Sequence, residues 1–308
     1  MGTNSFHLII AKIKKDGSFK IIDREKEICR LGSHRGKGLS YITEEEKELA
    51  INILSRFKKL TEIYNAPLRA IATSAIREAE NKLEFIENVR QNTGIEVEVI
   101  EGTEEAELIY RGVKNFMKVD DKKVLCVDIG GGSTEILLGD NGNTLFAGSV
   151  KVGAVRLSKR FFPDFILNRN SVDLCYKFIE SKILSNKEIN LKQKFDFAVG
   201  TSGTINAIAL IIHSLHHTIP FKKPKKFKFD FPQLQIVNNL VLNAKTTAER
   251  LKIQGMEQRR ADIIPAGVMI LEKIFQLFKI NEMRLSDYAL REGIILDAIE
   301  QRSGKHSG

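Results

Sequence analysis

The sequence predicts an α/β protein with two domains, and three features carry this prediction. Apolar runs of strand length alternate with amphipathic helical stretches along the chain. A length of 308 residues corresponds to about two domains. The polar stretch 119–123 separates two parts in which the alternation starts afresh. We therefore expect one domain at 1–118, a second at 119–292, and a C-terminal helix, 293–308, that is free to pack back on the first.

The first part begins with two β-rich runs, 6–13 and 19–28, which are expected to pair as a hairpin. Thr43 and Glu46 have the spacing of a capping box and predict the start of a helix. Gly94 is expected to end a later helix, because glycine adopts the left-handed conformation of a C-cap. The other elements expected in this part are strands at 68–72 and 95–100 and helices at 74–92 and 103–117.

The second part begins with a buried strand, 124–129, followed by a glycine-rich turn. Two further strands, 134–139 and 144–150, are joined by the turn Asp140-Asn141-Gly142-Asn143. The remaining expected elements are a strand at 195–199, a helix from the Gly200–Thr204 segment through Leu215, and helices near 233–243, 263–279 and 289–302.

Composition narrows the class of protein. An apolar share of 43% with 28% charged residues is that of a globular chain and argues against disorder. Three cysteines give no disulfide framework, so a cytoplasmic protein is expected. The longest apolar run, 207–212, is too short to cross a bilayer, so no membrane partner is expected. The balance of 48 basic against 39 acidic residues gives +9, which attracts polyanions or merely reflects a Lys-rich proteome.

An internal repeat relates the two parts. Placing residues 1–10 over 129–138 aligns Gly2 with Gly130 and Ser5 with Ser133, so each copy is a small-residue turn followed by an apolar strand. The second turn follows a strand that ends in Asp128, whereas nothing precedes the first. We therefore expect a further strand ending in an acidic residue upstream of Met1, lost through a misplaced start codon or truncation. The alternative is that Met1 is the true start and the first domain is built differently.

The segment Asp128–Glu135 is the strongest chemical signal. Three successive glycines after a strand let backbone N–H groups approach an anion, and the two carboxylates can hold Mg²⁺ beside phosphate oxygens. It is neither a Walker loop nor a dinucleotide fingerprint, because no Gly-Lys-Ser/Thr follows and the next element is a strand. A glycine-rich hairpin without a ligand is the alternative.

Two weaker signals accompany it. The Gly200–Thr204 turn suits phosphate at a helix N-terminus, or simply caps that helix. The helix start at Glu101–Ala106 offers a general base, or carboxylates that only complement the helix dipole. Spacing alone does not choose between Glu101, Glu104 and Glu105.

Several motifs, in order along residues 1 to about 295, resemble the exopolyphosphatase/guanosine pentaphosphate phosphohydrolase (Ppx/GppA) family. The resemblance implies two ribonuclease-H-like domains of the actin-like ATPase superfamily flanking a cleft, in a short form without the C-terminal helical domain of longer members. The motifs are Gly2–Leu8, Ala72–Arg77, Gly102–Ala106, Asp128–Glu135, Gly200–Thr204, Arg260-Ala261-Asp262 and Leu290–Gly293.

The resemblance also implies roles for residues. Glu105 matches the general base that activates water, and Asp128 and Glu135 match carboxylates that bind Mg²⁺ or another divalent cation. Arg77 matches an arginine that grips phosphate. The phosphate-binding residues implied are Gly2, Thr3, Asn4 and Ser5 in one loop, Gly130, Gly131, Gly132 and Ser133 in a second, and Gly200, Thr201, Ser202 and Gly203 in a third, adenosine-side turn. Met1 stands where the family has a hydrophobic residue after an Asp, so that Asp is absent from this sequence.

The expected activity is therefore release of orthophosphate from the end of inorganic polyphosphate. Hydrolysis of guanosine pentaphosphate is the first alternative, and a non-catalytic polyphosphate or nucleotide sensor is the second. Nucleic acid is not an expected partner, and a homodimer is compatible with the sequence. The Lys222–Lys228 run is a rim for a polyanion or a solvated loop, and His213, His216 and His217 are expected to be surface residues rather than metal ligands.

Overall fold

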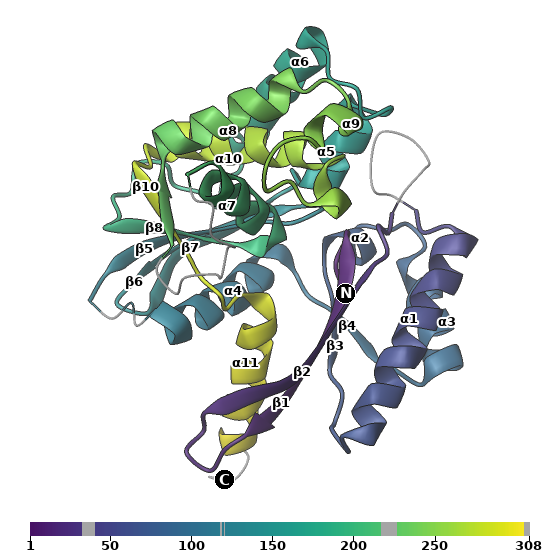
Figure 1. The fold of residues 1–308 in the computed structure, drawn as a ribbon. Helices are drawn as coiled ribbons and strands as arrows, with labels where there is room; N and C mark the ends of the chain where they lie inside the picture. The colour runs from purple at the N-terminus through teal and green to yellow at the C-terminus, as the bar shows by residue number, and fades with distance from the viewer. Residues whose placement is uncertain (33–40, 118, 120, 217–226, 305–308) are drawn as a thin grey trace. The chain divides into compact units, whose positions relative to one another are not determined.

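The computed structural model describes residues 1–32, 41–117, 119, 121–216 and 227–304. Contacts within the chain group it into two compact units (Figure 1). Unit 1 contains Met1–Glu105 and the C-terminal segment from Ile294, and unit 2 contains Ala106–Gly293. The unit limits fall inside two helices, α4 (Gly102–Met117) and α11 (Leu290–Gly304). The limits expected from the sequence are at 118/119 and 292/293.

Unit 1 contains the predicted hairpin, β1 (Ser5–Ile13) and β2 (Phe19–Ile28), paired antiparallel. A separate parallel pair is formed by β3 (Ala70–Ala72) and β4 (Val97–Val99). Alternate residues of β1 are buried, because a strand presents every second side chain to the core. The core that they enter includes apolar residues of the helices α1 (Glu44–Ile63), α2 (Ser74–Arg77) and α3 (Lys82–Thr93).

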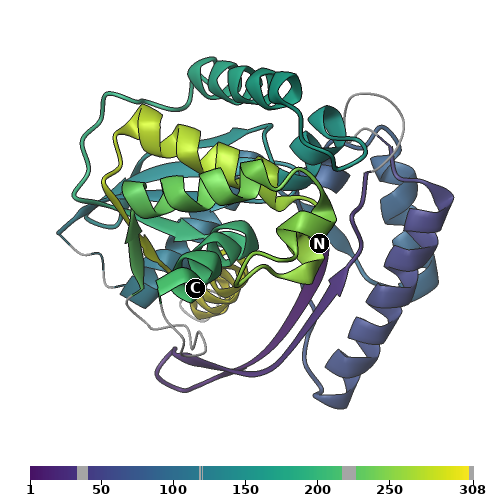
Figure 2. The ribbon, with the colours of Figure 1, turned by 45° about the horizontal axis from the view of Figure 1, so that its top comes forward.

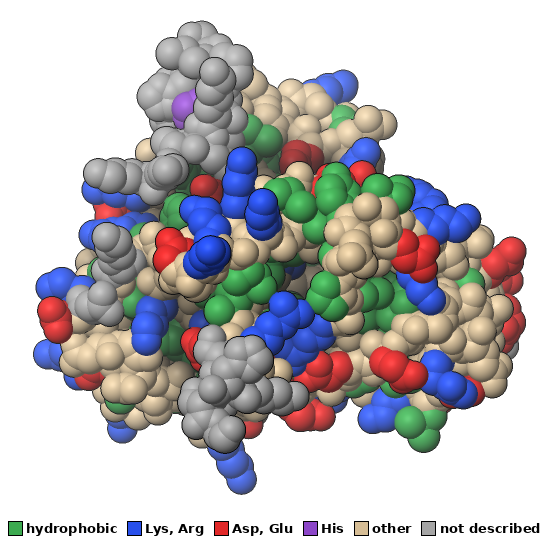
Figure 3. Space-filling model, turned by 90° about the horizontal axis from the view of Figure 1, so that it is seen from below, with side chains coloured by type: hydrophobic (Ala, Val, Ile, Leu, Met, Phe, Trp, Pro, Cys, Tyr) green, Lys and Arg blue, Asp and Glu red, His purple; other side chains and the backbone are tan. Residues whose placement is uncertain are grey.

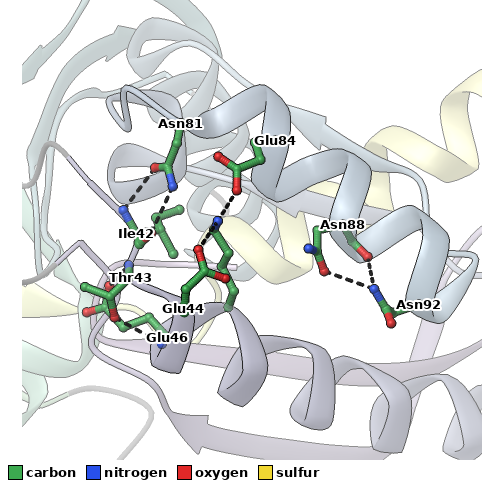
Figure 4. A network of polar contacts seen from close by, with 9 residues as sticks. Ile42, Thr43, Glu44, Glu46, Asn81, Glu84, Asn88 and Asn92 are labelled. Atoms are coloured by element: carbon green, nitrogen blue, oxygen red, sulfur yellow. Dashed lines mark hydrogen bonds and ion pairs between the residues drawn. The ribbon is translucent and has the colours of Figure 1, made fainter.

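The start of α1 confirms the predicted capping box. The Thr43 side chain accepts from the Glu46 N–H, while the Glu46 carboxylate accepts from the Thr43 N–H (Figure 4). The buried Lys47 ammonium pairs with Glu44 and with Glu84 of α3, so an ion pair ties the two helices.

The single helix expected at 74–92 is wrong, because the segment is divided into α2 and α3. The break lies at Glu78–Asn81. The Asn81 side chain accepts from the Ile42 N–H at 3.0 Å and donates to the Ile42 carbonyl at 2.9 Å (Figure 4). This pair of bonds to a distant segment fixes the chain where a continuous helix would run. Gly94 does end α3 in the left-handed conformation, as predicted.

Unit 2 contains a six-stranded sheet in the order β7-β6-β5-β8-β10-β9. The strands β5 (Lys123–Ile129), β6 (Thr134–Asp140) and β7 (Asn143–Val150) form an antiparallel meander, and the tight turn at Asn141-Gly142 has the positive φ angles that a two-residue hairpin requires. Beside β5, β8 (Phe197–Thr201) and then β10 (Glu282–Leu285) run parallel to it. The short β9 (Lys228–Asp230) pairs antiparallel at the edge. A meander extended by parallel strands is the sheet of a ribonuclease-H-like domain, which confirms the expected fold class.

Helices cover both faces of this sheet. Leu125, Val127 and Ile129 of β5 enter a large core with the helices of one face, where α8 (Phe231–Asn243) and α10 (Ile264–Phe278) run side by side (Figures 1 and 2). Val124 and Cys126 point to the other face and pack with α4. The helices on the first face are α5 (Ala154–Phe161), α6 (Arg169–Leu184), α7 (Ser202–His216), α8 (Phe231–Asn243) and α10 (Ile264–Phe278), with the short α9 (Thr247–Arg250) and a 3₁₀ turn (Gln258–Arg260) between α8 and α10.

The internal repeat predicted from the sequence has the same backbone turn in both units. Gly2 N donates to Ser5 O at 3.2 Å, and Gly130 N donates to Ser133 O at 2.9 Å. In unit 2, β5 joins the hairpin β6–β7 to β8. In the described part of unit 1, the hairpin and the pair β3–β4 are separate sheets. The strand expected upstream of Met1 stays a prediction.

The surface seen in Figure 3 mixes charges of both signs, with Lys and Arg side chains interspersed among Asp and Glu. The Lys222–Lys228 run lies outside the described residues except for its last two, and Lys228 pairs with Glu282 at 2.6 Å. Among the described residues, no helix combines the length and hydrophobicity needed to cross a membrane.

Candidate active site

The first glycine loop, Gly2–Ser5, precedes β1 in unit 1. The Asn4 carbonyl accepts from the N–H groups of Cys29 and Arg30, both at 3.2 Å, so the end of β2 holds the loop from one side. The Thr3 hydroxyl and the Asn4 side-chain oxygen are buried without a hydrogen-bond partner among the described residues. Buried polar atoms rarely lack partners in a folded protein, and their gathering in one loop is typical of a site that a ligand completes.

Glu105 and Arg77 are also brought together in unit 1. Arg77 Nη1 donates to a Glu105 carboxylate oxygen at 3.2 Å and to the Ile100 carbonyl at 2.8 Å. Glu105 is 7% exposed, whereas Glu101 and Glu104 are exposed side chains. Burial and the guanidinium therefore distinguish Glu105 among the three carboxylates that the sequence left open.

A row of polar side chains crosses four strands of the sheet in unit 2. Asp128 of β5 lies directly opposite Glu135 of β6 and in register with Thr201 of β8, and Glu135 is opposite Ser149 of β7. Cross-strand partners point to the same face of a sheet. The Ser149 hydroxyl donates to Glu135 Oε1 at 2.8 Å, and the Thr201 hydroxyl donates to Asp128 Oδ2. Each carboxylate is thus held from its outer side by a hydroxyl.

The electrostatics of this row suit a cation. Burial raises the pKa of Asp128 to about 6, against the opposing effects of the Thr201 hydroxyl and the positive charge of Arg291. Two adjacent carboxylates in a buried place repel each other unless a cation neutralises them. Mg²⁺ is commonly bound through one or two carboxylates plus phosphate oxygens. Asp128 and Glu135 fit that donor set, and no group of three His, Cys, Asp or Glu in the described part of the chain forms a complete protein cage.

The second glycine loop, Gly130–Ser133, follows the row directly at the end of β5. In the part of the chain that the structure describes, the N–H groups of Gly131, Gly132 and Ser133 have no acceptor. Successive free N–H groups in a tight loop form a concave site for an anion.

The third turn connects the end of a strand to the start of a helix, as the sequence predicted. Gly200 and Thr201 end β8, and Ser202 and Gly203 begin α7. The Thr201 hydroxyl is used on Asp128, so this residue supports a carboxylate in addition to any contact with phosphate. The Ser202 side chain accepts from the Ile205 N–H and caps the helix.

Three residues of these surroundings were not assigned roles from the sequence. Ser149 holds Glu135, Arg291 places positive charge near Asp128, and the Arg260 side chain lies against Gly203. Arg260 and Arg291 stand in motifs that the resemblance had marked without a role. Ser149 has no sequence signal, because its position follows from the register of β6 and β7.

A glycine loop whose N–H groups have no acceptor among the described residues, next to a row that contains two carboxylates, is typical of an α/β protein that binds phosphate. The sequence model described as the Ppx/GppA phosphatase family matches residues 9–302. This chain belongs to that family.

Relatives agree with this assignment. A Vibrio parahaemolyticus protein named guanosine-5′-triphosphate,3′-diphosphate pyrophosphatase is 30% identical over 304 residues, which cover 98% of this chain and 58% of that protein. The chain therefore spans little more than half the length of that relative. The crystal structure of an exopolyphosphatase from Cytophaga hutchinsonii is similar at a TM-score of 0.87 and 30% identity, covering 98% of this chain and 96% of that one. An Aquifex aeolicus Ppx/GppA structure has a TM-score of 0.79 at 30% identity, with the same coverage.

Proposed function

We propose that this protein releases orthophosphate from the end of inorganic polyphosphate by attack of water on the terminal phosphorus. The observation that carries the proposal is the row Ser149-Glu135-Asp128-Thr201, followed directly by a loop in which three N–H groups have no acceptor among the described residues. This combination offers phosphate both hydrogen-bond donors and a place for a divalent cation. The likeness to the Cytophaga exopolyphosphatase over nearly the whole of both chains supports it.

Glu105 is proposed as the general base. A buried carboxylate can take a proton from water as the water attacks, and the hydrogen bond from Arg77 helps to fix the orientation of the Glu105 carboxylate. Arg77 is proposed to contact phosphate as well, since its planar guanidinium offers several donors. The loops Gly2–Ser5 and Gly130–Ser133 would bind phosphate oxygens through N–H groups, with Gly200–Gly203 as a third contact.

Asp128 and Glu135 would hold Mg²⁺ or another divalent cation. When bound, that cation supplies positive charge that offsets the charge on phosphate oxygens. The two hydroxyls, from Ser149 and Thr201, keep the carboxylates of Glu135 and Asp128 in place. A cytoplasmic location is proposed because Cys29, Cys126 and Cys175 are all free thiols.

Hydrolysis of guanosine pentaphosphate is the second candidate, and the name of the Vibrio relative favours it. The same residues would serve both reactions. Phosphate release from long-chain polyphosphate and from guanosine pentaphosphate, measured side by side with and without EDTA, tests the proposal. The higher kcat/KM identifies the preferred substrate. Tight binding of either substrate without release would instead favour a sensor and overturn the enzymatic proposal.

A further inference from the structure

N–H groups in the first turn of α5 donate hydrogen bonds to backbone carbonyls of the second glycine loop, Gly130–Ser133. Three successive carbonyl groups of the loop accept hydrogen bonds from this turn, and the fourth is bonded within the loop itself. The bonds run from Ala154 N to Gly130 O (3.0 Å), from Val155 N and Arg156 N to Gly131 O (2.9 and 3.0 Å), and from Arg156 Nε to Gly132 O (2.6 Å).

These bonds determine where the free N–H groups of the loop point. A peptide group is planar and trans, so its C=O and N–H point in opposite directions. Holding the carbonyls of Gly130, Gly131 and Gly132 toward α5 therefore directs the N–H groups of Gly131, Gly132 and Ser133 away from it. These are the same three N–H groups that have no acceptor among the described residues.

Arg156 and Gly153 are the two residues of this segment that contribute most directly to holding the loop. Among the described residues, the Arg156 side chain is the hydrogen-bond partner that holds the peptide group between Gly132 and Ser133. Gly153 lies so close to the loop that a Cβ there would be 2.5 Å from backbone atoms of Gly131 and Gly132. Its φ of −153° is open to any residue, so close approach is what requires glycine.

We infer that Arg156 and Gly153 are positioning residues for phosphate binding: they hold the loop Gly130–Ser133 with three N–H groups turned outward. The inference rests on the proposed function of that loop. Neither side chain needs to touch substrate. The device resembles an oxyanion hole, in which donors held in advance by the fold bind more tightly than donors that must be ordered on binding.

The test compares Arg156→Met, Arg156→Lys and Gly153→Ala with Arg160→Met in the full chain. Arg160 is a matched control, because it lies one turn further along α5 and stacks on Phe178 at 4.2 Å. Arg156→Met and Gly153→Ala should each lower kcat/KM for phosphate release by about tenfold or more, since a donor that is no longer held binds phosphate less well. Arg156→Lys should recover part of this loss, because an ammonium can still donate to the carbonyl. Arg160→Met should leave kcat/KM within about twofold.

A second measurement separates the inference from the proposed function. Backbone NMR shifts of Gly131, Gly132 and Ser133 are followed while inorganic pyrophosphate is added. The wild-type amides should respond, and the Ser133 amide should respond at several-fold higher pyrophosphate concentration in Arg156→Met. If wild-type protein releases no phosphate yet this difference is seen, the enzymatic proposal fails and the inference stands. Equal responses in Arg156→Met and Arg160→Met, or no response in the wild type, would overturn the inference.

Discussion

Arg77 donates a hydrogen bond to Glu105 at 3.2 Å, although the two residues are 28 positions apart. Arg77 ends the short helix α2, and Glu105 lies in the first turn of α4. The same Nη1 atom also donates to the Ile100 carbonyl, so the guanidinium is fixed on two sides. This contact and its burial distinguish Glu105 from the neighbouring Glu101 and Glu104, which are exposed.

Glu105→Gln is expected to lower kcat for phosphate release by about 10²–10⁴, the usual contribution of a general base. The amide oxygen of Gln can still accept from Arg77, so the thermal midpoint should change little. Glu104→Gln is the matched control, because Glu104 lies in the same turn and is exposed. Retained turnover in Glu105→Gln, or an equal loss in Glu104→Gln, would exclude Glu105 as the base.

Much of the fold follows from local signals in the sequence. The hairpin β1–β2, the capping box at Thr43 and the turn at Asn141-Gly142 depend on residues close together in the chain, and each was predicted correctly. Helices α5 and α6 and strands β9 and β10 were not predicted. The break between α2 and α3 was also missed, because it depends on the contact of Asn81 with Ile42, 39 positions away.

The candidate site also combines features that can be predicted from the sequence with contacts that only the folded chain shows. Glycine turns and carboxylates at strand ends are visible in the sequence, since each is a short motif. The position of Ser149 opposite Glu135 depends on strand register, and the contact of Arg156 with Gly132 depends on how α5 meets a loop 24 positions earlier. Such partners become apparent only when the chain is folded, because no short spacing encodes them.

Asp128→Asn is expected to stabilise the protein in metal-free buffer at pH 8. Burial raises the pKa of Asp128 from its ordinary value of 3.8 to about 6, so the folded state binds this proton more tightly than the unfolded state. The wild type therefore loses stability as the pH rises from about 4 to 6, and the loss is complete above that window. A difference of about two pKa units between the folded and unfolded states lowers the free energy of unfolding by roughly 3 kcal/mol at most.

Urea unfolding at pH 5 and pH 8 tests whether Asp128→Asn stabilises the protein and whether the effect grows with pH. The advantage of Asp128→Asn should be largest at pH 8 and shrink at pH 5, where part of the wild-type carboxyl is already protonated. Asp140→Asn is the control at the other end of the β5–β6 pair, where Asp140 pairs with Lys123 at 3.3 Å near the surface. Asp140→Asn should lower the free energy of unfolding by about 1 kcal/mol or less. A destabilised Asp128→Asn at pH 8 would contradict the prediction.

The three cysteine thiols are expected to be unreactive in the native protein. Burial raises the pKa of Cys29 and of Cys175 to about 12, and burial also raises the pKa of Cys126. Because only the thiolate reacts, a thiol reagent at pH 8 should label none of them within the time that labels an unfolded control. In denaturing urea it should label three. Rapid labelling of one native thiol would show that its surroundings open without global unfolding.

Gly203→Ala is expected to have opposite effects with and without the Arg260 side chain. A Cβ on Gly203 would lie 1.9 Å from Arg260 Nη2, so the guanidinium must move. In the wild type, Gly203→Ala should therefore lower kcat/KM and destabilise the fold. In an Arg260→Ala background the space is open, and alanine is a better helix former than glycine by about 1 kcal/mol, so the same change should be neutral or stabilising. Urea unfolding of the four proteins in this cycle should give a coupling of about 1–3 kcal/mol. Additive effects would show that the two side chains do not meet, and that Arg260 is not held at the start of α7.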